Sequence, residues 1–170
     1  RLRAETCAVP VPPRYEVTAT SDTLVRRDTT LEALAALPPV FDRKYGSVTA
    51  GNSSPLTDGA AAVLLMSEEK ARAEGLPTLA YVRSWAVAAV DPGGQLLMGP
   101  ALAIPQALER AGLRLSDMDL IEMHEAFAAQ VASNIQALES DVWARAKLGR
   151  AKAVGKVDRE ILNVCGGSIA

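Results

Sequence analysis

A short apolar strand that leads directly into an amphipathic helix is the feature that most constrains this fold. The strand is predicted over residues 120–123. The apolar residues of the helix recur at helical spacing and share one face: Phe127, Val131, Ile135 and Leu138. His124, the only histidine of the chain, lies at the junction. Ligands of helix-covered sheets bind at such junctions, outside the carboxyl ends of the strands. The sequence therefore predicts an α/β protein with His124 as its first candidate site residue.

The electrostatics of this junction suggest what His124 can do. The start of a helix offers unpaired N–H groups and a partial positive charge. That charge disfavours the imidazolium form, so we expect a mainly neutral ring with an N–H for a negative oxygen. A hydrogen-bonded structural histidine is the competing interpretation, and the junction alone favours it.

Further strands are predicted on both sides of the chain's midpoint. The continuous apolar run 60–66 is typical of a strand that is buried on both faces. Residues 78–90 alternate small and large side chains, which predicts a long strand with two different faces. Residues 163–170 are predicted to return to strand and to a glycine turn.

Helices are predicted between these strands. Thr29 to Leu37 carries a capping pattern, and Ser67 is placed to cap a helix over 68–74. Another helix is expected to end at Gly112, with Pro105 starting it or kinking its first turn. A charged, helical surface excursion is predicted over 141–160. Strands that alternate with helices indicate a layered α/β sheet.

Composition excludes several classes of protein. Hydrophobic residues make up 49% of the 170 residues and charged residues 22%, which is typical of a globular protein. A net charge of −2 gives no reason to expect nucleic acid as a partner. No apolar run reaches the roughly 20 residues of a membrane span, and no signal peptide is recognised.

The two cysteines, Cys7 and Cys165, lie far apart in the sequence and in unlike surroundings. A disulfide between them is not expected, and with one histidine they build no recognisable metal site. We expect no metal, a reducing compartment, a spacer role for Cys7 and a packed, small apolar thiol at Cys165.

The segment Gly51-Asn52-Ser53-Ser54 has the backbone freedom and the hydroxyl groups to lie against an extended polar ligand. By itself this is a weak signal, because such strings are usually ordinary loops.

Four strings in order and spacing carry a resemblance that covers nearly the whole chain. They are Val48 to Val63, Gly99-Pro100 followed by Ala107 to Gly112, His124 to Ala128, and Asn163 to Ala170. Together they resemble the thiolase family, most clearly from Phe41 onward. Most thiolases carry Asn where this chain has His124. The His-Glu-Ala-Phe form, with Phe41-Asp-Arg-Lys44 upstream, is similar to the β-subunit type of the fatty-acid oxidation multienzyme complex.

The resemblance implies part of a layered αβαβα fold built from two similar halves. By this analogy residues 1–47 are the end of a loop region, residues 48–75 close the first half, and residues 76–170 begin the second. The chain is accordingly expected to be an internal piece of a longer protein.

The resemblance also implies roles for individual residues. Ser54, with Ser53 and Asn52 beside it, would lie along the pantetheine arm of coenzyme A. His124 would help to build the oxyanion hole that polarises the thioester carbonyl, directly or through a water molecule. Glu125 is expected to anchor the turn. Three further residues are placed near the site as structural residues: Phe127, Gly166 and Gly167.

Other catalytic groups of the family are not expected within this chain. A thiolase needs a nucleophilic cysteine in the first half, a histidine in a Gly-His-Pro motif and a second cysteine in a Cys-x-Gly motif. The first would precede Arg1, and the Gly-His-Pro motif would follow Ala170. Neither Cys7 nor Cys165 is expected to replace them, so the isolated chain is predicted to be inactive.

The implied function is CoA-dependent cleavage of 3-ketoacyl-CoA to acetyl-CoA and a shortened acyl-CoA, the acyltransferase reaction of fatty-acid β-oxidation. Coenzyme A would be a substrate, and no permanently bound cofactor is expected. A homo-oligomer or a complex with a hydratase/dehydrogenase subunit is the expected assembly, in the bacterial cytoplasm or, in a eukaryote, the mitochondrion. The alternative is a non-catalytic, thiolase-like protein that binds acyl-CoA or acts as a scaffold.

Overall fold

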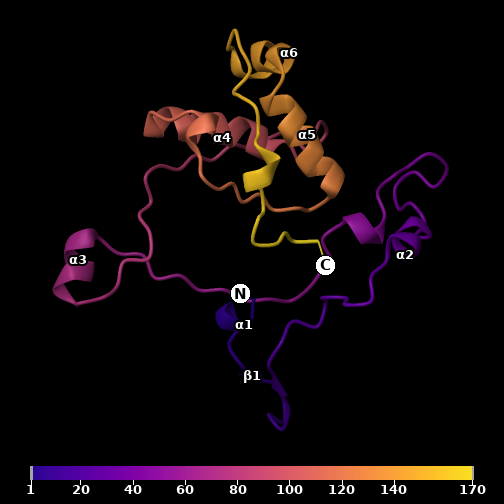
Figure 1. Cartoon of the computed structure of the whole chain (residues 1–170), viewed down its shortest axis with the longest axis vertical. Coiled ribbons are helices and arrows are strands. Elements are labelled where there is room, and N and C mark those ends of the chain that lie inside the picture. The colour runs from indigo at the N-terminus through magenta and orange to yellow at the C-terminus, as the bar shows by residue number, and fades with distance from the viewer. Residues whose placement is uncertain (1, 170) are drawn as a thin grey trace. The chain divides into compact units, whose positions relative to one another are not determined.

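The computed structural model describes residues 2–169, which divide into two compact units. Unit 1 contains residues 1–55, 119–132 and 158–170. Unit 2 contains residues 56–118 and 133–157. Figure 1 shows the chain coloured by residue number, from indigo at the N-terminus to yellow at the C-terminus.

Unit 1 consists mainly of short elements joined by irregular chain. The strands β1 (Val9–Pro10) and β2 (Thr18–Ala19) form an antiparallel pair, in which Val9 lies opposite Ala19. The remaining elements of this unit are α1 (Leu2–Glu5), α2 (Leu31–Ala35), η1 (Ala50–Asn52), η4 (Arg159–Ile161) and the first turn of α5 (Ala128–Leu138).

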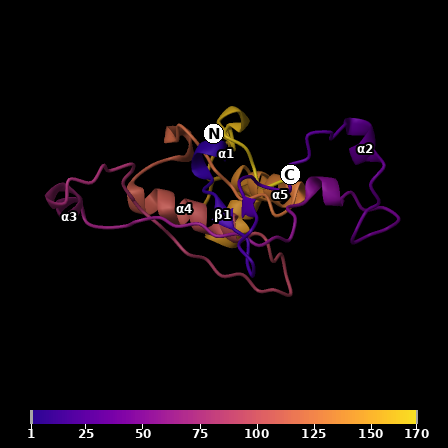
Figure 2. The same ribbon diagram turned by 90° about the horizontal axis from the view of Figure 1, so that it is seen from below.

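Unit 2 is dominated by α4 (Gly99–Ala111) and the second half of α5, which lie next to each other (Figure 1 and Figure 2). Its other elements are α3 (Glu68–Ala73), η2 (Leu115–Asp117), α6 (Asp141–Trp143) and the π-helical turn η3 (Ala144–Leu148).

The helices that were predicted from local signals are confirmed, with small shifts at their ends. Thr30, rather than Thr29, caps α2 by accepting a hydrogen bond from the N–H of Ala33. Gly112 ends α4 in the left-handed conformation that favours glycine. Pro105 lies inside α4 and not in its first turn, because the helix already begins at Gly99.

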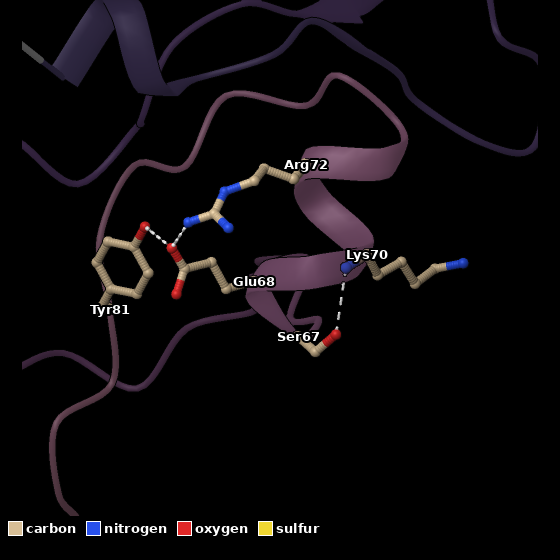
Figure 3. Close-up of polar contacts among 5 residues, drawn as sticks. All are labelled: Ser67, Glu68, Lys70, Arg72 and Tyr81. Atoms are coloured by element: carbon tan, nitrogen blue, oxygen red, sulfur yellow. Dashed lines mark hydrogen bonds and ion pairs between the residues drawn. The ribbon is translucent and has the colours of Figure 1, made fainter.

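Helix α3 is stabilised by contacts within its own neighbourhood (Figure 3). The hydroxyl of Ser67 accepts a hydrogen bond from the N–H of Lys70, which satisfies one of the free donors of the first turn. The carboxylate of Glu68 pairs with Arg72 one turn later and accepts a hydrogen bond from the hydroxyl of Tyr81 at 3.3 Å. Ser67 therefore caps the helix as the sequence predicted.

The core of unit 2 is organised by Asn134, whose side chain is fully buried. Its Oδ1 accepts a hydrogen bond from the N–H of Ala101 in the first turn of α4, at 2.9 Å. Its Nδ2 donates to the carbonyl oxygen of Leu97, just before that helix, also at 2.9 Å. Met98 occupies the N-cap position of α4, but its side chain makes no capping hydrogen bond. Asn134 on α5 therefore serves as the cap of α4 from a distant part of the sequence.

Apolar burial surrounds this polar contact. Met98, Ala101 and Ala137 form a buried cluster against which Trp143 packs. The stripe predicted on α5 is confirmed for its last three members, because Val131, Ile135 and Leu138 are all buried. Phe127 lies one residue before the helix and is half-buried.

Regular strands were predicted at four places where the structure has none, one of them over 163–170, of which residues 163–169 contain no strand. Residues 60–66 and 78–90 run without assigned secondary structure, and Val63, Leu79 and Trp85 are largely exposed. The prediction of 120–123 is reduced to a single parallel bridge between Ile121 and Leu162. A strand is defined by a hydrogen-bonded neighbour, and no segment among residues 2–169 forms a ladder with these runs.

The segment 141–160 is only partly the surface excursion that was expected. It begins with helical turns, but Ala144 and Val157 are buried. Asp141 accepts a hydrogen bond from the N–H of Ala153 at 2.8 Å. That bond, helped by the charge of Lys152, lowers the pKa of the Asp141 carboxyl. The charged residues therefore fold the segment back on itself.

Replacement of Asn134 should destabilise unit 2 selectively. Asn134→Ala leaves the N–H of Ala101 and the carbonyl of Leu97 without their buried partner, so the free energy of unfolding should fall by about 1–3 kcal/mol. Urea unfolding measures this change. The matched control is Gln136→Ala, on an exposed position of the same helix, and an equal loss in both variants would contradict the prediction.

Candidate functional site

The predicted ligand-binding loop lies beside the junction in unit 1. The N–H of Ser54 donates a hydrogen bond to the carbonyl oxygen of Ala126 at 2.9 Å. Ser53 forms an antiparallel bridge with Phe127. The ring of Phe127 makes an edge-to-face contact with Phe41, with centroids 5.8 Å apart. The segment 53–54 is therefore held directly against the residues that follow His124.

The carboxyl end of the described chain is fastened to the same junction by Asn163. Its Oδ1 accepts a hydrogen bond from the N–H of Met123 at 2.7 Å, and its Nδ2 donates to the carbonyl oxygen of Met123 at 2.9 Å. The same Nδ2 also donates to Oε1 of Glu125 at 2.8 Å. Asn163 has a φ of 50°, which asparagine tolerates better than most residues. One amide thus joins two segments that are 40 residues apart.

The carboxylate of Glu125 completes the connection by entering the glycine turn. Its Oε2 accepts hydrogen bonds from the N–H of Ser168 at 3.0 Å and, more weakly, from that of Ile169 at 3.4 Å. A Cβ on Gly167 would clash with this carboxylate, so a larger residue there would force the Glu125 side chain to move. Gly166 has a φ of 108°, which also requires glycine. The turn is built around the carboxylate.

His124 is exposed and contacts this turn through one ring nitrogen. Its Nδ1 lies 2.7 Å from the hydroxyl oxygen of Ser168, which leaves Nε2 directed elsewhere. The partial charge of a helix end is strongest within the first turn of the helix. Helix α5 begins only at Ala128, so His124 lies outside that turn. The structure therefore gives no support to the prediction that the helix end disfavours the imidazolium form of His124.

The loop residues take different parts in this arrangement. Asn52 uses its side chain within its own loop, accepting from the N–H of Thr49 at 2.9 Å and donating to the carbonyl of Ser47 at 2.8 Å. The hydroxyl of Ser53 donates to the carbonyl of Thr49 at 2.7 Å. Among residues 2–169, the hydroxyl of Ser54 has no such partner, which leaves it available to a ligand.

Two residues of the site were not predicted. Asn163 and Ser168 lie in one of the four segments that resemble thiolases, but no role was predicted for either residue. Their one local signal is that both are polar residues next to a glycine-rich turn at the end of an apolar segment. Their partners lie about 40 residues away, so spacing alone could not identify them.

The cysteines agree with the predictions only in part. Both are free, and Cys7 is exposed, as a spacer residue would be. Cys165 is exposed as well, so the prediction of a packed thiol at this position is wrong. The glycine turn that follows Cys165 packs against Glu125, while Cys165 itself lies at the surface. Within residues 2–169, no group of three His, Cys, Asp or Glu side chains is placed to hold a metal ion.

Comparison with known families identifies the class of protein. Residues 5–69 match the N-terminal domain of thiolase, and residues 76–170 match its C-terminal domain. The chain belongs to the thiolase family.

Among individual proteins, the chain is 54% identical to the 3-ketoacyl-CoA thiolase of Yersinia pestis (strain Pestoides F) over 99% of its own length. The protein of the same name from Yersinia pseudotuberculosis (strain IP 31758) is equally similar. In both cases the chain spans 38% of the relative's length.

Solved structures agree with this assignment and confirm the predicted fold class, a partial α/β thiolase fold. The dimeric peroxisomal thiolase of Saccharomyces cerevisiae is 34% identical, with a TM-score of 0.79 over 98% of this chain and 37% of that one. Human mitochondrial 3-ketoacyl-CoA thiolase in complex with CoA is 37% identical, with a TM-score of 0.73 over 96% of this chain and 36% of that one.

Neutralising the Glu125 carboxylate should loosen the glycine turn that it holds. Glu125→Gln replaces one acceptor oxygen by an NH₂ group, which then faces Asn163 or the backbone N–H groups, all donors. Exchange of the Ser168 amide hydrogen should accelerate by about 10- to 100-fold, as expected for a lost charge-assisted hydrogen bond.

Hydrogen exchange followed by NMR measures this acceleration. Glu122→Gln makes the same chemical change at an exposed neighbouring position and should leave the exchange rate unchanged. Unaltered exchange in Glu125→Gln would show that the carboxylate does not hold the turn.

Proposed function

We propose that this chain supplies the thioester-binding and carbonyl-polarising part of a 3-ketoacyl-CoA thiolase, an acetyl-CoA C-acyltransferase. The reaction cleaves 3-ketoacyl-CoA with free CoA to give acetyl-CoA and a shortened acyl-CoA. Identity of 54% over 99% of the chain to proteins with this name supports the proposal. The observation that carries it in the structure is the assembly of His124, Ser54 and the glycine turn around one junction.

The geometry suits an oxyanion hole. When a thiolate attacks a thioester, negative charge develops on the carbonyl oxygen, and fixed N–H donors stabilise it. His124 is exposed, and its ring is held on one side by Ser168, so its other nitrogen is free to face that oxygen. We propose that the imidazole contributes this donor, directly or through a water molecule.

The loop beside His124 is proposed to hold the substrate's coenzyme A. Ser54 lies next to the junction with an available hydroxyl, which supports contact with the amide-bearing pantetheine arm. Ser53 and Asn52 support this contact by shaping the loop, since their side chains bond to its backbone. Coenzyme A is in this proposal a substrate, and no permanently bound cofactor or metal takes part.

Assembly and location follow from the same relatives as proposals. A homo-oligomer fits the dimeric yeast thiolase, and a complex with a hydratase/dehydrogenase subunit fits the His-Glu-Ala-Phe form of the junction. The similar Yersinia proteins favour the bacterial cytoplasm, and a eukaryotic source would favour the mitochondrion. No helix in the described residues is long and apolar enough to cross a membrane.

A grafted enzyme tests the proposed function. The matching segment of the Yersinia pestis 3-ketoacyl-CoA thiolase is replaced by this chain, so that the relative supplies the rest of its sequence. We expect CoA-dependent cleavage of 3-ketoacyl-CoA. His124→Ala should lower kcat by about 10²- to 10³-fold, as loss of an oxyanion donor does. His124→Asn should retain more activity because it keeps an N–H donor.

Controls separate catalysis from folding and from simple binding. Ser21→Ala changes an exposed residue away from the junction and should leave kcat unchanged. A folded graft that binds CoA without turnover would favour the acyl-CoA-binding or scaffold alternative. The 170-residue chain alone should show no thiolysis, and any rate that depends on Cys7 or Cys165 would contradict this expectation.

A further inference from the structure

The contact between His124 and Ser168 restricts how the imidazole can act. Nδ1 of His124 lies 2.7 Å from the hydroxyl oxygen of Ser168, a typical distance for a strong hydrogen bond. A ring nitrogen that is engaged in this way does not face a ligand at the same time. Only Nε2 is left for the substrate.

We infer that Ser168 is a positioning residue, whose hydroxyl donates a hydrogen bond to Nδ1 and holds the neutral imidazole in the Nε2–H tautomer. Nε2–H then points toward the thioester oxygen. This inference rests on the proposed function, because it explains how His124 acts as a donor. Which nitrogen of a neutral histidine carries the proton is set by the hydrogen bond at the other nitrogen.

The opposite arrangement does not serve the same purpose. If Nδ1–H donated to the Ser168 oxygen, neutral His124 would present a lone pair at Nε2. That lone pair would repel the developing negative charge instead of stabilising it. In a neutral imidazole, an oxyanion donor at Nε2 therefore requires Ser168 to be the donor at Nδ1.

The backbone of Ser168 is itself held by the turn, at a place from which its hydroxyl reaches Nδ1 of His124. Its backbone N–H is held by Glu125, and Asn163 holds Glu125 from the other side. Gly167 allows the carboxylate to approach. Glu125 is thus occupied by donors of the turn, which leaves the serine hydroxyl as the polar group set against Nδ1.

A double-mutant cycle in the grafted enzyme tests this coupling. In the His124 background, Ser168→Ala should lower kcat by about five- to tenfold with little change in KM, as loss of one neutral hydrogen bond predicts. Ser168→Thr keeps a hydroxyl and should restore most of the rate. In the His124→Asn background, Ser168→Ala should have no further effect on kcat.

The outcomes are distinct. An equal loss from Ser168→Ala in both backgrounds would overturn the inference, since Ser168 would then act on the fold and not through His124. Ser21→Ala, a serine-to-alanine change at an exposed position, serves as the matched control. A graft without any thiolysis, with His124 and Ser168 intact, would instead be a failure of the proposed function.

A spectroscopic readout needs no turnover. His124 is the only histidine of this chain, so nitrogen-15 NMR of the labelled chain reports one imidazole. We expect the Nε2–H tautomer alone, and in Ser168→Ala a new population of the Nδ1–H tautomer. A predominant Nδ1–H form in the unaltered chain, or identical tautomer ratios in the two proteins, would overturn the inference.

Discussion

The site depends on one half-buried contact, the docking of the Glu125 carboxylate into the turn that contains Gly166 and Gly167. Three donors converge on this carboxylate: the backbone N–H groups of Ser168 and Ile169, and the side-chain amide of Asn163. A carboxylate that accepts several N–H groups is held firmly, because each is a charge-assisted bond. This contact fixes the backbone of Ser168, the residue whose hydroxyl lies 2.7 Å from Nδ1 of His124.

Each unit also contains an asparagine whose neutral side-chain amide pairs with backbone groups of a distant segment. In unit 2 the amide of Asn134 accepts from the N–H of Ala101 in the first turn of α4 and donates to the carbonyl oxygen of Leu97, two residues before the helix. In unit 1 the amide of Asn163 pairs with both backbone groups of Met123. An asparagine side chain carries an acceptor and donors side by side, so it can replace a strand or helix partner of the backbone. In each unit, an asparagine side chain thereby satisfies backbone N–H and C=O groups that have no partner in a helix or strand.

How much of this the sequence predicts depends on the range of the interactions. The cap at Ser67 and the helix end at Gly112 involve neighbours within a few residues, and these predictions are confirmed. The capping pattern that begins at Thr29 is confirmed with a shift of one residue, to Thr30. The runs 60–66 and 78–90 have strand composition, but a strand also needs a partner elsewhere. Such pairing is non-local, and composition does not reveal whether the partner is at hand. The exposed Val63 and Trp85 are the visible consequence.

The site shows the same limit at the scale of single residues. His124 stands out in the sequence because it is the only histidine and follows an apolar segment, both of which are local facts. Asn163 and Ser168 can be recognised as site residues only in the folded structure, because both contact residues about 40 positions away. A helix end offered a simple local explanation for the state of the imidazole, yet α5 begins only at Ala128. The orientation of the catalytic candidate is therefore set by a serine in a distant turn, and local sequence patterns cannot reveal it.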